Sequence, residues 1–156
     1  MTYADSVELI RETMHSRGVD RRVVLHGVQR IAALVHPEQI VLCDAGLSDE
    51  PADSFTGRVV VFTATRVIVA DLVGGDDVLD SVSARAWRRS ALDLVEMVGA
   101  DNDWEQPNPD GTLPSGGGLR LSYGPERVIE LPLKRYSVPD GLDSLVDSLA
   151  ADLVAP

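Results

Sequence analysis

The sequence predicts an α+β protein, in which an antiparallel β-sheet is accompanied by amphipathic helices near both ends of the chain. Two runs of β-branched and aromatic residues, centred on Val59–Phe62 and Val67–Ala70, flank a short polar break. This pattern is typical of a tight antiparallel hairpin whose two strands, over residues 57–63 and 65–72, are largely buried. Apolar residues also repeat at helical spacing before this hairpin and again close to the C-terminus.

Two helices are expected ahead of the sheet. Apolar residues spaced by four, three and four predict the first helix over residues 3–17, and these are Tyr3, Val7, Ile10 and Met14. A second apolar stripe predicts a helix over residues 21–36, which ends before Pro37 because the residue preceding proline disfavours helical backbone. This helical hairpin would cover the sheet or contact another subunit.

Strands are expected on both sides of the central hairpin. The apolar run from Ile40 to about Cys43 predicts a first strand, and residues 44–57 follow it as a polar, acidic loop. Alternating residues predict a strand around residues 84–89, with a partner strand over residues 92–98. A helix over residues 88–98 is the alternative interpretation.

The remainder of the chain predicts a loop, a second hairpin and a final helix. Residues 101–118 are rich in proline, glycine and acidic residues, which is typical of an exposed loop. The runs Leu119–Tyr123 and Arg127–Leu131 predict the second hairpin. The last helix begins near Pro139–Gly141, and one of its faces is apolar: Leu142, Leu145, Val146, Leu149 and Leu153.

Charge and composition exclude several classes of function. The net charge of -11 repels nucleic acid and anionic lipid and attracts cationic partners. Cys43 is the only cysteine, so one chain forms neither a disulfide nor a thiol-based zinc cluster. The first residues lack the pattern of a signal peptide and the apolar runs are too short to span a membrane, so we expect a cytoplasmic location.

The hairpin Val59–Ala70 resembles the bacterial pleckstrin-homology-like (PH-like) domains. In that family a strand ending in threonine turns through a short polar link to an arginine that opens the next strand, as Thr63 and Arg66 are spaced here. The element order matches over about residues 38–154. The resemblance implies a curved antiparallel sheet or barrel of about seven strands with a C-terminal capping helix. The helical hairpin, residues 1–37, lies outside the module, so we expect it to precede a PH-like domain at residues 38–156 within one compact unit.

The resemblance also implies a binding or scaffolding role without chemistry. Family members that bind phosphoinositides carry lysines and arginines around the first inter-strand loop. The corresponding loop here has no cation and four carboxylates, Asp44, Asp49, Glu50 and Asp53. We therefore expect protein binding rather than phosphoinositide binding at a membrane.

No catalytic, cofactor or metal site is predicted. The run Asp101–Glu105 begins like a calcium-binding loop, but Gln106 and Thr112 replace the glycine and glutamate that such a loop requires. The glycines at 116–118 lack the Lys-Ser/Thr of a phosphate-binding loop, and the three histidines lack metal-ligand spacing. No nucleophile, base and orienting group can be named together.

The candidate interaction residues are arginines and tryptophans, which are enriched at binding hot spots. The densest basic cluster contains Arg85, Trp87, Arg88 and Arg89, and Trp104 is a second exposed-aromatic candidate. Alternatively, these arginines pair with the protein's own carboxylates, and Trp104 packs back onto the domain.

The functional hypothesis is a non-enzymatic interaction or scaffolding module of the cytoplasm, whose partner is another protein or a second copy of itself. One alternative is a carrier that holds a small apolar ligand between the sheet and the helices. Another is a small acidic chaperone or adaptor, which predicts helices packed across one face of a sheet.

Overall fold

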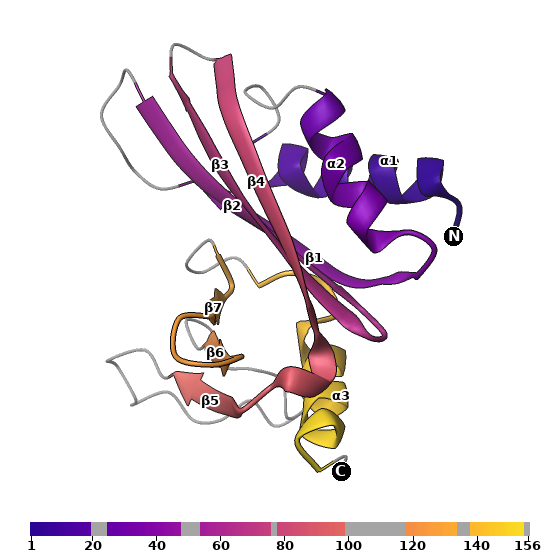
Figure 1. Cartoon of the computed structure of the whole chain (residues 1–156), viewed down its shortest axis with the longest axis vertical. Helices are drawn as coiled ribbons and strands as arrows, with labels where there is room; N and C mark the ends of the chain where they lie inside the picture. The colour runs from indigo at the N-terminus through magenta and orange to yellow at the C-terminus, as the bar shows by residue number, and fades with distance from the viewer. Residues whose placement is uncertain (20–24, 48–53, 76–77, 99–117, 134–137, 155–156) are drawn as a thin grey trace. The chain divides into compact units, whose positions relative to one another are not determined.

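The computed structural model of the chain (Figure 1) divides into two units, Met1–Arg88 and Arg89–Pro156. The structure describes residues 1–19, 25–47, 54–75, 78–98, 118–133 and 138–154. Within these residues the first unit contains two helices and four strands, and the second contains a single 3-10 turn, three strands and one α-helix. The protein is therefore α+β, as the sequence predicts.

The helices of the first unit follow the predicted apolar stripes. Helix α1 (Tyr3–Ser16) begins with a capping box, in which Thr2 and Asp5 each accept a hydrogen bond from the other's backbone N–H. It ends where Gly18 adopts a φ of 78°, the left-handed conformation that commonly terminates helices. Helix α2 (Leu25–Val35) confirms the described part of the second predicted helix.

The four strands of the first unit form an antiparallel meander in the order β1-β2-β3-β4. Their bounds are β1 (Ile40–Leu47), β2 (Ser54–Thr63), β3 (Arg66–Gly75) and β4 (Val78–Arg88). Strands β2 and β3 are the predicted central hairpin, with Phe62 opposite Val67. Strands β1 and β4 are the two edges of this sheet within the described residues.

Helices α1 and α2 lie across one face of this sheet, which we call the helix face (Figure 1). The apolar side chains of that face and of the two helices form one core, and its strand members include Ala45, Val59, Val61, Ile68, Ala70 and Leu72. The opposite face, here the second face, is also apolar and buried, with Leu42, Val60, Phe62, Val67 and Val69. The central strand positions on both faces are therefore filled by apolar side chains.

The second unit contains a smaller antiparallel sheet in the order β5-β6-β7. Its strands are β5 (Leu94–Val98), β6 (Gly118–Ser122) and β7 (Val128–Leu131), and helix α3 (Leu142–Val154) follows them. The hairpin of β6 and β7 and the final helix are confirmed. Three residues of the predicted α3 stripe are buried, Leu142, Leu145 and Leu149, whereas Leu153 is exposed.

Two predictions about the strands are wrong. Strand β5 pairs with β6 instead of with the strand that contains residues 84–88, because the chain leaves β4 through the 3-10 turn Arg89–Ala91 and enters the other sheet. The same arrangement excludes the alternative helix over residues 88–98. The described strands also form two separately hydrogen-bonded sheets of four and three strands, which is not a closed barrel.

Candidate functional site

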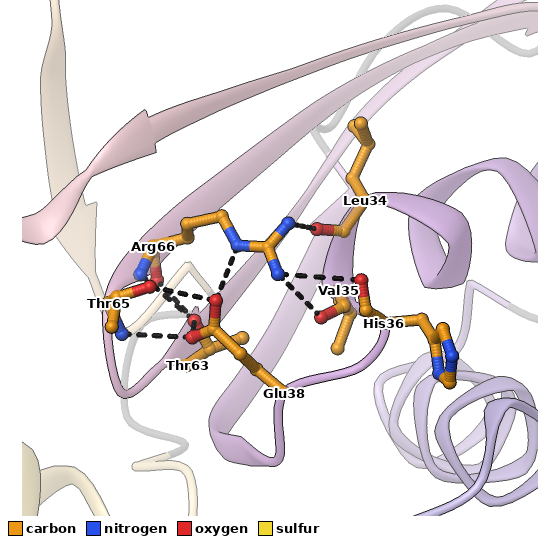
Figure 2. Close-up of polar contacts among 7 residues, drawn as sticks. All are labelled: Leu34, Val35, His36, Glu38, Thr63, Thr65 and Arg66. Atoms are coloured by element: carbon orange, nitrogen blue, oxygen red, sulfur yellow. Dashed lines mark hydrogen bonds and ion pairs between the residues drawn. The ribbon is translucent and has the colours of Figure 1, made fainter.

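The best-defined polar cluster of the first unit joins the turn between β2 and β3 to the end of α2 (Figure 2). We call it the Glu38–Arg66 clamp, and it comprises Glu38, Thr63, Thr65 and Arg66. Glu38 lies in the link between α2 and β1, where its carboxylate reaches the hairpin turn. The hydroxyl of Thr63 donates to Glu38 Oε2 at 2.7 Å, and the hydroxyl of Thr65 donates to Oε1 at 2.8 Å. Arg66 Nε donates to the same Oε1 at 2.7 Å.

The rest of the Arg66 guanidinium is directed at the last carbonyls of α2. Its Nη1 donates to the carbonyl of Leu34 at 2.7 Å, and its Nη2 donates to the carbonyls of Val35 and His36 at 3.3 and 3.4 Å (Figure 2). The final carbonyls of a helix lack partners within the helix, and a cation there is favoured by the helix dipole. The arginine therefore caps α2 while it also binds Glu38.

These contacts decide the charge state of Glu38. Partial burial favours the neutral carboxyl, but hydrogen bonds from Thr63, Thr65 and Arg66 outweigh that effect and lower the pKa of Glu38 to about 2. An ionised carboxylate that already accepts this many hydrogen bonds is a poor proton acceptor. The clamp therefore positions a helix against a hairpin, and the threonine and arginine that carry the family resemblance have a structural role.

The four predicted interaction residues between positions 85 and 89 do not form one patch. Strand alternation places Arg85 and Trp87 opposite Val69 and Val67, on the second face, whereas Arg88 lies opposite Arg66 on the helix face. Arg85 and Arg88 are exposed, and Trp87 is half-buried. Arg89 belongs to the second unit. Trp104, the fifth candidate, lies outside the described residues.

At or next to β4, each face of the sheet combines two arginines with one carboxylate among the described side chains. On the second face, Asp71 binds Arg58 at 2.8 Å and Arg85 at 2.6 Å. On the helix face, Arg66 binds Glu38 at 2.7 Å and is the cross-strand neighbour of Arg88. Among the described residues, Arg88 has no carboxylate within ion-pair distance. The described side chains on both faces of this edge therefore carry a surplus of positive charge, although the chain as a whole is acidic.

Arg89 is not part of an exposed basic cluster, which corrects that part of the sequence prediction. It is buried in the second unit, where Nε donates to Asp152 Oδ2 at 2.9 Å and Nη2 donates to Ser148 Oγ at 2.5 Å. Asp152 and Ser148 both lie on α3. The alternative interpretation, pairing with the protein's own carboxylates, is therefore the correct one for Arg89.

Asp44 also differs from its prediction as part of an acidic loop. Strand β1 continues to Leu47, and Asp44 lies within it, fully buried. Its Oδ1 lies 3.3 Å from Nε of Arg17, which follows α1. The other three predicted loop carboxylates, Asp49, Glu50 and Asp53, lie outside the described residues. One of the four charges is thus neutralised inside the first unit.

Cys43, next to Asp44, has no features of a reactive thiol. It packs against the core of the helix face. Burial raises the pKa of the thiol to about 12, and a hydrogen bond with Thr13 only partly offsets this effect. Reactive cysteines require a lowered pKa, so Cys43 is a packing residue.

The described residues contain no group of three or more histidine, cysteine, aspartate or glutamate side chains able to hold a metal ion. The predicted calcium-like run, residues 101–105, lies outside them. None of the described helices combines the length and the apolar character that crossing a membrane requires. No family model, curated protein or solved structure matches the chain.

Proposed function

We propose that the protein is a non-enzymatic interaction or scaffolding module of the cytoplasm, and that strand β4 is its docking element. One observation carries this proposal, namely that Arg85 and Arg88 are exposed on an edge strand, although Arg85 shares Asp71 with Arg58, whereas the polar groups named next are buried or bind each other. Glu38 and Arg66 bind each other, Arg89 binds Asp152, and Asp44 is buried. Exposed arginines beside a half-buried tryptophan are typical of protein-binding surfaces.

The charge distribution supports a protein partner. A net charge of -11 disfavours nucleic acid and anionic lipid, because both present dense negative charge over a surface much larger than a single strand of this protein. Screening confines such repulsion to about 8 Å at physiological ionic strength. The binding of a partner that contacts only β4 therefore depends on the local surplus of arginine.

A matched pair of double variants tests this proposal. Purified protein with an affinity tag is incubated with lysate of its own source, cross-linked and analysed by quantitative mass spectrometry. We expect Arg85→Ala/Arg88→Ala to lose the captured partner and Arg11→Ala/Arg120→Ala to keep it. Both variants remove two exposed positive charges, and thermal denaturation checks that both are folded.

The contrary results are equally clear. Equal loss in both double variants would mean that only net charge matters, and no specific partner for the wild type would remove the basis for an interaction module. Turnover by the purified protein in an activity screen would also contradict a non-enzymatic role.

A small acidic chaperone or adaptor is the second candidate. It requires helices packed across one face of a sheet, and the position of α1 and α2 over the β1–β4 sheet favours it. Such a protein would suppress the aggregation of a client, which light scattering of a denatured test protein measures. An apolar-ligand carrier has no comparable support among the described residues and stays a prediction, to be checked by native mass spectrometry.

The PH-like arrangement is also a proposal. The order of the elements supports it, because four strands are followed by three strands and one helix. The local sequence of the hairpin that contains Thr63 and Arg66 supports it as well. It adds the requirement that the two sheets pack together as a curved sheet with α3 at one end. An experimental structure that places the sheets apart would refute it.

A further inference from the structure

We infer that the open edge of β4 accepts an extended acidic segment of another protein as an added antiparallel or parallel strand. This inference rests on the proposed interaction function and specifies the chemistry of its partner. Strand addition supplies affinity through main-chain hydrogen bonds and specificity through alternate side chains. It therefore requires an accessible strand edge and complementary charges at defined positions along that edge.

Strand β4 provides the accessible edge. Within the described residues it pairs only with β3, in regular register from Ser81 opposite Val73 to Arg88 opposite Arg66. Every second residue of an edge strand directs its N–H and C=O away from the sheet. None of the residues from Ser81 to Arg88 is buried, whereas the other edge, β1, has four buried residues. The two edges of the sheet are thus unequal, and β4 is the exposed one.

Because side chains alternate between the two faces along β4, an added strand fits this edge better than a ligand that lies on one face. Arg85 and Arg88 lie on opposite faces, three residues and about 10 Å apart along the strand. A ligand on either face of the sheet reaches only one of them. An added strand presents side chains to both faces, so two acidic residues three positions apart would each meet one arginine.

The local charges select an acidic occupant. Arg85 shares Asp71 with Arg58, and Arg88 neighbours Arg66, whose guanidinium is bound to Glu38. Among the side chains that the structure describes near β4, each face therefore has one positive charge in excess of its carboxylates. Opposite charges on adjacent strands stabilise the pair, and like charges destabilise it.

The same charges argue against a second copy as the occupant. Two β4 edges would bring like-charged arginines together, which destabilises the pairing of the strands. Arginines on an exposed edge are a common means of preventing such self-association. The partner is therefore a different protein with an extended acidic segment.

The test uses four blocked eight-residue peptides with the full-length protein. The first contains threonine, valine and two glutamates three residues apart, and its isomer has the glutamates four residues apart, on one face. The third is the first peptide with N-methyl groups on alternate residues, and the fourth has lysines for glutamates. Fluorescence anisotropy measures binding, and hydrogen exchange locates it.

We expect the first peptide to bind at least fivefold more tightly than its isomer, and to slow amide exchange in β4. N-methylation and lysine should each weaken binding at least tenfold, because they remove the main-chain hydrogen bonds or the charge complementarity. The protein variant Arg85→Glu/Arg88→Glu should reverse the preference and select the lysine peptide. Arg11→Glu/Arg120→Glu is the matched control and should retain the wild-type preference.

Equal affinity for the first peptide and its isomer would overturn the arrangement across two faces. Equal affinity for the N-methylated peptide would overturn strand addition. If no peptide binds and the captured partner still depends on Arg85 and Arg88, strand addition fails while the proposed interaction function stands. A wild-type dimer that Arg85→Glu/Arg88→Glu dissociates would instead assign the edge to a second copy.

Discussion

The two sheets of this protein differ in the polarity and exposure of their faces. In the four-stranded sheet the centres of both faces are apolar and buried, and the charged contacts lie at the end of the β2–β3 hairpin and toward the β4 edge. In the three-stranded sheet one face is apolar, while the other carries a charged row across its middle, Glu96–Arg120–Glu130. The difference teaches that the exposure of a charged contact, rather than the number of ion pairs, decides how much that contact contributes to the free energy of unfolding.

The sequences of the strands show the same difference. Strand β2 contains the continuous run Val59–Phe62, which is typical of a strand buried on both faces. Strand β6 alternates, with Arg120 between Leu119 and Leu121, which is typical of a strand with one exposed face. The period of apolar residues therefore distinguishes the two sheets before any contact is known.

The largest expected effect is on the core of the second unit. Leu149→Asp places a charge at a fully buried position of α3, so we expect loss of the folded second unit at a cost above about 4 kcal/mol. Leu153→Asp is the control, because Leu153 belongs to the same predicted stripe but is 43% exposed. Circular dichroism and hydrogen exchange of α3 measure both. A folded Leu149→Asp monomer derived from a wild-type dimer would show that α3 is an interface instead.

The next effect compares two consecutive arginines. Arg89→Ala leaves Asp152 without its buried partner, and we expect it to lower the free energy of unfolding by about 3 kcal/mol. Arg88→Ala removes an exposed side chain and should change that free energy by less than about 0.5 kcal/mol. Urea denaturation measures both variants. Similar values for the two arginines would contradict the burial of Arg89.

These arginines also show how far the sequence could predict the site. Periodicity identified both α1 and the central hairpin, because each depends on neighbours close in the chain. The separation of Arg88 from Arg89 depends on a turn into another sheet, and the partner of Arg89 lies 63 residues later. A local pattern contains neither fact.

The absence of long-range contacts from a local pattern also explains why the positions of Asp44 and Glu38 could not be predicted. An aspartate after an apolar run is typical of a loop, and the ion pair with Arg17, which is distant in sequence, helps to make its burial in β1 acceptable. Thr63 and Arg66 are recognisable as a motif in the sequence, but nothing in the sequence around Glu38 indicates that its carboxylate binds them. The clamp was therefore predictable in its hairpin half and not in its carboxylate.

The clamp should give an intermediate effect that depends on pH. Glu38→Gln removes the charge that accepts hydrogen bonds from Thr63, Thr65 and Arg66, and we expect a loss of about 2 kcal/mol at pH 7. The folded pKa of about 2 lies below the ordinary value of 4.5, so this stability is present above pH 4.5 and is lost as pH falls toward 2. Urea denaturation at several pH values should show wild type and variant converging over that interval. A constant difference would exclude ionised Glu38 as the cause, and Glu8→Gln is an exposed control.

The smallest effect is expected in the charged row of the second sheet. Arg120 lies 3.8 Å from Glu96 and 3.7 Å from Glu130, and all three side chains are at least 50% exposed. Exposed pairs at such distances are screened by water and salt, so Arg120→Ala should change the free energy of unfolding by less than about 0.5 kcal/mol. Urea denaturation at low and high salt measures this change. A loss of more than about 1 kcal/mol would mean that the row is desolvated in solution, and the contrast between the two sheets would then rest on apolar burial alone.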